Sequence, residues 1–268
     1  VISMFTEMIC QKLMQKETTY TDGSAMLTGV LLALNLPATL PLWEAAIGCV
    51  FAIAVVQQLF GGLGCNFANP AITGRVFLLL SFGGDMTTWV KPFFYRGRSF
   101  FGMFAATGNL PDGVTGATPL SIMTTAIKTN DPSVLNSDPD ALHLLLGNNP
   151  TGGAGTIGEV CALALILGLC FMLWRKIITW HIPVAIIATV FVFSGLLHLA
   201  NPVYANPLTV ILSGGLMLGA IFMATDYVTS PMTHKGQIIY GVCIGFLTVV
   251  IRNWGSYPEG MSFAILIM

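Results

Sequence analysis

Residues 157–174 (IGEVCALALILGLCFMLW) and residues 178–199 (ITWHIPVAIIATVFVFSGLLHL) are two apolar runs joined by the basic pair Arg175 and Lys176. A helix needs about 20 mostly apolar residues to cross the hydrocarbon layer of a membrane, and both runs come close to that length. Further apolar runs occupy residues 25–36, 43–60, 70–82, 207–224, 237–251 and 261–268. The sequence therefore predicts an all-α fold, a polytopic membrane helical bundle that forms a single domain over residues 1–268.

The composition agrees with a membrane protein and excludes several partners. Hydrophobic residues make up 54% of the chain and charged residues 9%, whereas a soluble domain carries roughly 25% charged residues. The net charge is −1, and no run of lysine and arginine offers a surface for nucleic acid. We expect membrane lipid and other membrane proteins as partners, and no nucleic acid.

Several of the apolar runs are too short to cross a membrane. As a helix, residues 70–82 would extend only about 20 Å, less than the roughly 30 Å of the hydrocarbon layer. Short runs interrupted by glycine or proline indicate broken helices, whose free backbone groups must be buried in protein or line a cavity. The chain also begins at Val1 inside an apolar run, and we expect further membrane helix before it.

The basic residues predict which side of the membrane each loop faces. Short loops rich in lysine and arginine lie in the cytoplasm, which places Arg175 and Lys176 there. Counting spans backwards from this loop puts residues 83–156 on the extracytoplasmic side and Lys12 and Lys16 inside. The two basic clusters therefore agree on one orientation.

A weak internal repeat relates the two ends of the chain. At an offset of 193, residues 46–51 align with residues 239–244, and residues 65–72 align with residues 258–265. The topology makes the two copies run in opposite directions, as in the inverted repeats of transport proteins. We expect the first-repeat helices in residues 25–82 and the second-repeat helices in residues 157–268.

A few charged residues lie inside or at the ends of the apolar runs. Such residues are costly in lipid, so they are candidates for function, although helix capping or contact with the membrane surface would also explain them. They are Arg75, Glu159, Asp226, Lys235, Arg252 and Glu259.

Other patterns that could carry chemistry are weak. The G-x-G-x-x-G run at residues 153–158 follows no β-rich segment, and no acidic residue follows at the distance expected of a dinucleotide site. The cysteines and histidines have no metal-like spacing, and no catalytic acid–base set can be assembled. We expect no metal and no catalytic side chain, so any redox chemistry must come from a cofactor.

One polar stretch offers a place for such a cofactor. Residues 111–120 (PDGVTGATPL) carry the hydroxyl groups of Thr115 and Thr118 among residues too small to shield them, and Pro119 favours an extended backbone at Thr118. A bulky group could be attached at this position. An ordinary turn is the alternative, because Asp-Gly and proline are common in loops.

Three motifs together resemble one family. They are GGLGCNFANPA at residues 61–71, DGVTGATPL at residues 112–120 and SYPEG at residues 256–260. The combination is similar to the D subunits of the Rnf complex and, more distantly, to the B subunits of the sodium-translocating NADH:quinone reductase. The resemblance covers essentially the whole chain and implies a urea-transporter-like bundle with an inverted repeat.

The resemblance also implies a cofactor site. Family members join FMN to the last threonine of an S/T-G-A-T motif through a phosphodiester, which assigns covalent FMN, as a phosphothreonine, to Thr118. Thr115, Gly116, Ala117 and Asp112 would belong to the same site. A second, non-covalent flavin, riboflavin, is also implied, without a position in this sequence.

The implied function is electron transfer coupled to ion transport. The resemblance implies a subunit of an ion-translocating ferredoxin:NAD oxidoreductase in the bacterial cytoplasmic (inner) membrane, with the A, B, C, E and G subunits of the Rnf complex as partners. Electrons would pass through the FMN while Na⁺ or H⁺ crosses the membrane. Two alternatives are open: a B subunit of the quinone reductase, and a flavin-free transporter or channel on the same scaffold.

Overall fold

The computed structural model describes residues 1–19, 21–89, 118–137, 141–147, 155–255, 257 and 259–268, and this part of the chain is helical without strands. The α-helices are α1 (Ile2–Leu13), α2 (Ser24–Leu34), α3 (Leu42–Val50), α4 (Pro70–Ser81), α5 (Gly83–Met86), α7 (Pro119–Thr129), α8 (Ala141–Leu146), α9 (Ala162–Trp174), α10 (His181–Ala200), α11 (Pro207–Leu212), α12 (Leu216–Leu218), α13 (His234–Trp254) and α14 (Gly260–Ile267). The π-helices η1 (Phe51–Gln58) and η4 (Gly219–Met223) continue α3 and α12, and the 3₁₀-helices are η2 (Pro132–Ser137) and η3 (Ile157–Glu159). The predicted all-α class is confirmed.

Two helices have the length and composition of membrane spans. α10 has 20 residues with a mean hydropathy of 2.2, and α13 has 21 residues with a mean hydropathy of 1.4. α10 leaves large apolar side chains such as Phe191, Val192 and Leu196 exposed, as expected of a surface in contact with lipid. The shorter apolar helices are α2, α3 with η1, α4 and α9, at the positions that the sequence predicted.

The helix that follows α10 is broken. α11 ends at Leu212, and α12 begins at Leu216, so three residues, Ser213, Gly214 and Gly215, interrupt it. We call these three residues the strap. Gly214 has a φ of +65°, which a residue with a side chain rarely adopts. The broken helix predicted for this type of scaffold is therefore present in residues 207–223.

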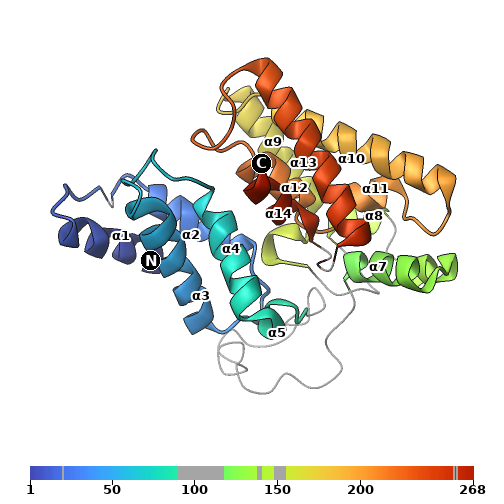
Figure 1. Ribbon diagram of the computed structural model, residues 1–268, viewed down its shortest axis with the longest axis horizontal. Helices are drawn as coiled ribbons and strands as arrows, with labels where there is room; N and C mark the ends of the chain where they lie inside the picture. Colours follow the sequence, from blue (N-terminus) through green and yellow to red (C-terminus); the bar gives the residue numbers. More distant parts are fainter. Residues whose placement is uncertain (20, 90–117, 138–140, 148–154, 256, 258) are drawn as a thin grey trace.

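The helices of the N-terminal part, α1 to α5, lie together, and α9 to α14 form a second group beside them (Figure 1). α4 and α14 pack against each other where the groups meet. The core contains buried side chains from both groups, among them Leu32, Ile72, Ile186, Leu216, Ile221 and Ile244. One continuous core therefore joins the two ends of the chain.

α10 and α13 pack closely because glycines face α10. A Cβ atom on Gly241 would lie 2.7 Å from the Cβ of Ala185, and one on Gly245 would lie 2.9 Å from the Cβ of Thr189. Small residues four apart are the usual way for membrane helices to approach each other. This contact joins the two longest helices of the described chain.

The predicted repeat units have similar element orders. Residues 42–81 form a helix, a loop and the short α4, and residues 234–267 form a helix, a loop and the short α14. The inverted relation between them stays a prediction. The long segment 83–156 has helices that the sequence analysis did not predict, and α7 is the longest of those described.

Candidate functional site

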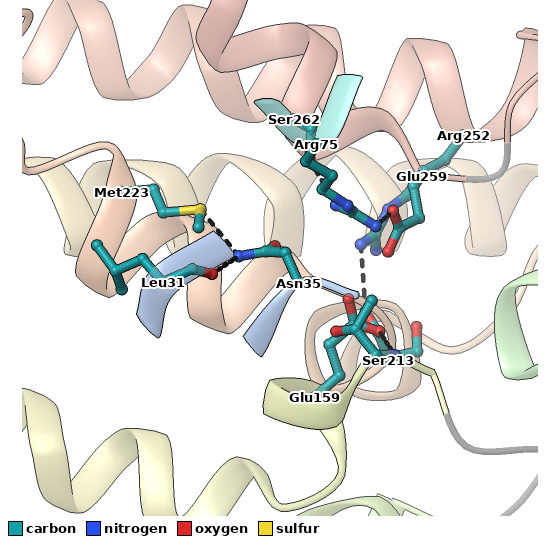
Figure 2. Close-up of polar contacts among 10 residues, drawn as sticks. Leu31, Asn35, Arg75, Glu159, Ser213, Met223, Arg252, Glu259 and Ser262 are labelled. Atoms are coloured by element: carbon teal, nitrogen blue, oxygen red, sulfur yellow. Dashed lines mark hydrogen bonds and ion pairs between the residues drawn. The ribbon is translucent and has the colours of Figure 1, made fainter. Parts of the chain in front are cut away.

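A buried ion pair joins α4 to α14. Arg75 extends from α4 and pairs with Glu259, the residue directly before α14. Its Nη1 also donates a hydrogen bond to the Oγ of Ser262, at 2.6 Å (Figure 2). The side chains of Arg75 and Glu259 are 4% and 13% exposed. A charge in the membrane interior is costly unless it is paired, and each of these two supplies the other's partner.

Arg252 approaches the same place from the last turn of α13. Its Nη1 donates to the carbonyl oxygen of Val210 at 2.7 Å, and its Nη2 donates to that of Ser213 at 3.1 Å. Both carbonyl groups lie where α11 ends, so no N–H of a following helical turn pairs with them, and the hydroxyl of Ser213 also donates to the carbonyl of Val210 at 3.3 Å. Arg252 therefore satisfies backbone groups that the break in the helix sets free.

Glu159 completes a cluster of two arginines and two glutamates. It ends η3, and its Oε2 accepts a hydrogen bond from the backbone N–H of Thr156 at 3.2 Å. Its Oε1 is buried without a hydrogen-bond partner among the described residues, and its negative charge acts on both Arg75 and Arg252. The formal charges of the four residues sum to zero. We call Arg75, Glu159, Arg252 and Glu259 the charge cluster.

The strap passes through the charge cluster because it has no bulky side chain. A Cβ on Gly215 would lie 2.9 Å from Oε1 of Glu159 and 3.7 Å from both Nη1 of Arg75 and Oε1 of Glu259. Any larger residue would fill the space between these groups. The sequence analysis did not single out Gly215, although the adjacent pair Gly214 and Gly215 inside an apolar run was the available signal.

Four of the six charged residues that the sequence pointed to therefore lie together. The other two do not join them. Asp226 lies in the turn after η4, where its carboxylate accepts from the backbone N–H of Val228 and the hydroxyl of Thr229. Lys235 is exposed at the start of α13. Asp226 thus bonds within its own turn, and Lys235 lies at an exposed helix end.

Thr118 lies at the N-terminus of α7. Its backbone is extended, as Pro119 predicted, with φ −73° and ψ 155°. Its Oγ1 accepts a hydrogen bond from the backbone N–H of Ser121 at 3.2 Å, and the residue is only 7% exposed. The expectation of an open loop hydroxyl is corrected here, because Thr118 is the capping residue of an 11-residue helix. Asp112, Thr115, Gly116 and Ala117, the other residues assigned to this site, lie outside the described residues.

The position of Thr118 fits a phosphate group. The first N–H groups of a helix have no partner within the helix, and together with the helix dipole they favour an anion. Oγ1 of Thr118 is the atom that would carry a phosphoester, and the N–H of Ser121 already points to it. Pro119 has no N–H, so Leu120 and Ser121 are the residues of this turn whose N–H groups could donate to the phosphate of a nucleotide such as FMN.

A buried carboxylate outside the charge cluster, Glu7, was not among the residues that the sequence indicated. Glu7 is fully buried on α1, and its Oε1 accepts hydrogen bonds from the side-chain amides of Gln58 at 3.2 Å and Gln11 at 3.3 Å. The sequence pointed only to an apolar run at Val1 with further membrane helix expected before it. A single glutamate at its centre was the available signal.

Among the residues that the structure describes, neither the glycine run nor a group of metal-binding side chains forms a site. Of residues 153–158, those the structure describes lead into the short η3 rather than an α-helix, so the rejected dinucleotide motif lacks its helix here. Within the described ranges, no three histidine, cysteine, aspartate or glutamate side chains could hold a metal ion together.

Comparison with known proteins identifies the family. The model of the NQR2, RnfD, RnfE family matches residues 1–268. The chain belongs to this family. Among its relatives is the D subunit of the Na⁺-translocating ferredoxin:NAD⁺ oxidoreductase complex of Acetobacterium woodii, 44% identical over 268 residues, which cover 100% of this chain and 74% of the relative.

Two other relatives carry related names. The D subunit of the proton-translocating ferredoxin:NAD⁺ oxidoreductase complex of Clostridium ljungdahlii is 39% identical over 274 residues, covering 100% of this chain and 76% of the relative. The D subunit of the ion-translocating oxidoreductase complex of Stutzerimonas stutzeri is 40% identical over 256 residues, covering 92% and 71%. Relatives whose names give different ions, Na⁺ and H⁺, are thus similarly related to this chain.

Proposed function

We propose that this chain is the D subunit of an ion-translocating ferredoxin:NAD⁺ oxidoreductase complex in a bacterial cytoplasmic membrane. The family match over the whole chain and the 44% identity to such a D subunit support this function. The three relatives described above are all D subunits, which favours this function over that of a quinone reductase B subunit. The coupling ion is Na⁺ or H⁺, and the partners are the A, B, C, E and G subunits of the Rnf complex.

We further propose that Thr118 holds FMN through a phosphodiester on Oγ1. The observation that carries this proposal is the place of Thr118 at the N-terminus of α7, where the N–H of Ser121 donates to Oγ1. Bound FMN would supply the redox chemistry that the side chains of this chain lack. Thr118 would fix the distance of the cofactor within the complex, and the first turn of α7 would stabilise the negative charge of its phosphate.

The remaining parts of the proposed site follow from the family resemblance. Asp112, Thr115, Gly116 and Ala117 would shape the segment that precedes Thr118, and riboflavin would be a second flavin of this subunit. The orientation predicted from the basic residues places Thr118 on the extracytoplasmic side. Electrons from cytoplasmic ferredoxin would then have to cross most of the membrane, with centres in partner subunits bridging the gap.

Covalent flavin can be tested with three substitutions of Thr118. Thr118→Ala removes both the acceptor hydroxyl and the helix cap, whereas Thr118→Asn keeps a capping side chain but offers no hydroxyl. Thr118→Ser keeps both. We expect flavin fluorescence on a denaturing gel for the parent and for Thr118→Ser, and none for the alanine and asparagine variants. Bands as bright as the parent's in both of those variants would overturn the assignment.

A further inference from the structure

The first turn of α7 packs against the strap, next to Arg252. Leu120, in that turn, is 5% exposed, and a Cβ atom on Gly214 would collide with its Cδ1. The same Cβ would lie 3.2 Å from Nη2 of Arg252. Leu120, Thr124 and Arg252 also line one small cavity of about 20 Å³. The guanidinium group therefore lies next to the helix that begins at Thr118.

The charge of Arg252 is not neutralised by direct contact. The residue is 6% exposed, its hydrogen bonds go to backbone carbonyl groups, and no carboxylate among the described residues forms an ion pair with it. Arg75, in contrast, is paired with Glu259. Glu159 acts on Arg252 from beyond ion-pair distance and also acts on Arg75. In a medium of low dielectric constant, such a charge acts over several ångströms.

Thr118 lies within the range of this charge. It precedes Leu120 by two residues, which corresponds to about 3 Å along a helix axis. The N-terminus of α7 and the guanidinium of Arg252 thus favour negative charge in the same region. A flavin that takes up two electrons and one proton gains one negative charge, so a nearby cation stabilises its reduced form.

We propose that Arg252 is a positioning residue for the flavin on Thr118: it holds the strap under the first turn of α7 and raises the midpoint potential of that flavin through its charge. The proposal rests on the proposed function. It assigns a redox role to an arginine whose hydrogen bonds, by themselves, indicate only a structural one.

The first test is a redox titration of the covalent flavin in the purified complex, followed by absorbance. Arg252→Met removes the charge, and we expect a more negative midpoint potential. Arg252→Lys keeps the charge and should give a potential closer to the parent's. Ile127→Ala removes packing from the same cavity without changing charge, and we expect the parent's potential. A potential for Arg252→Met equal to that of the parent would overturn the proposal.

A second pair of variants keeps Arg252 and the strap intact, in case Arg252→Met does not assemble. Thr124 lines the cavity beside Arg252. Thr124→Asp places a carboxylate there, and Thr124→Asn introduces a side chain of nearly the same shape without the charge. We expect a more negative midpoint potential for the aspartate variant than for the asparagine variant. Equal potentials would contradict the proposal.

Flavin attachment at Thr118 and the redox role of Arg252 can fail separately. If the parent complex shows no covalent flavin in this subunit, both the assignment of Thr118 and the role of Arg252 are wrong. If the parent carries the flavin but Arg252→Met has the parent's potential, or the two Thr124 variants have equal potentials, only the role of Arg252 is wrong.

Discussion

Arg75 on α4 forms an ion pair with Glu259 at the start of α14, and it also bonds to Ser262, which is 187 residues away in the sequence. The two short helices come from the predicted first and second repeats. Neither is long enough to cross a membrane by itself, with 12 and 8 described residues. A paired charge at their junction fixes their relative position, because any other arrangement would leave a charge unpaired in the interior.

Removing one partner of this pair should be strongly destabilising. Arg75→Met leaves the carboxylate of Glu259 buried and unpaired, and Glu259→Gln leaves the guanidinium without its counter-charge, so we expect each to cost about 3–5 kcal/mol. The double variant Arg75→Met with Glu259→Met removes both charges and should recover much of the loss. Thermal unfolding in detergent measures the difference, with the exposed Lys235→Met as control. A double variant that loses the sum of the two single effects would contradict this account.

Close packing between α10 and α13 should depend on Gly241. The methyl group of Gly241→Ala would lie 2.7 Å from the Cβ of Ala185 and 3.1 Å from the carbonyl oxygen of Ile182, a backbone atom that cannot rotate away. We expect a loss of about 1–3 kcal/mol in unfolding free energy. Gly83→Ala is the matched control, since a Cβ there meets nothing within 4 Å. Equal stability of the two variants would show that the helices separate at no cost.

The capping role of Thr118 can be measured apart from flavin attachment. Loss of the cap in Thr118→Ala should cost about 0.5–2 kcal/mol of the local stability of α7, whereas Thr118→Ser and Thr118→Asn should cost little. Hydrogen exchange of the amides of α7 reports this local opening. Protection that is equal in the alanine and asparagine variants would mean that the hydrogen bond to Ser121 contributes nothing.

Thr115 should affect flavin attachment less than Thr118 does. We expect Thr115→Ala to retain some covalent flavin, because this hydroxyl is proposed to help shape the segment rather than to accept the phosphate. Fluorescence on a denaturing gel gives the retained fraction relative to the parent. Complete loss in Thr115→Ala with Thr118 present would show that the acceptor or its recognition has been assigned wrongly.

The sidedness of α7 can be tested with single cysteines on opposite sides of the predicted topology. Counting spans forward from Arg175 and Lys176 puts the loop before α13 in the cytoplasm, opposite to α7. Ser133 is exposed and follows α7; Ser133→Cys keeps the backbone N–H that donates to Asp131 at 2.8 Å. Met232 is 94% exposed and precedes α13, so Met232→Cys is the second position. The exposed Cys65 and Cys170 are first replaced by serine. A membrane-impermeant maleimide should label Ser133→Cys in intact cells and Met232→Cys only in broken cells. The reverse pattern would place Thr118 on the cytoplasmic side.

The amino-acid sequence determined the class of fold and the positions of its long apolar helices. Apolar runs must avoid water and helices satisfy their own backbone groups, so runs such as residues 178–199 and 237–251 are close to α10 and α13 in the structure. The sequence also indicated Thr118 as a place where a cofactor could be attached, because a hydroxyl group before a proline and among small residues is a local pattern. It gave no indication of α7, whose amphipathic turns are too short to separate from a loop by periodicity.

Only the tertiary structure decided which charged residues belong together. Arg75, Glu159 and the nearby residues Arg252 and Glu259 come from three distant parts of the sequence, and each could have been a cap, a turn residue or a surface residue. Which charges pair depends on how α4, α13, α14 and the strap pack together. That packing joins residues far apart in the sequence. The contact of Leu120 with the strap beside Arg252 has the same origin. Gly214, in its left-handed conformation, and Leu120, 94 residues earlier, have no local relation that a sequence pattern could reveal.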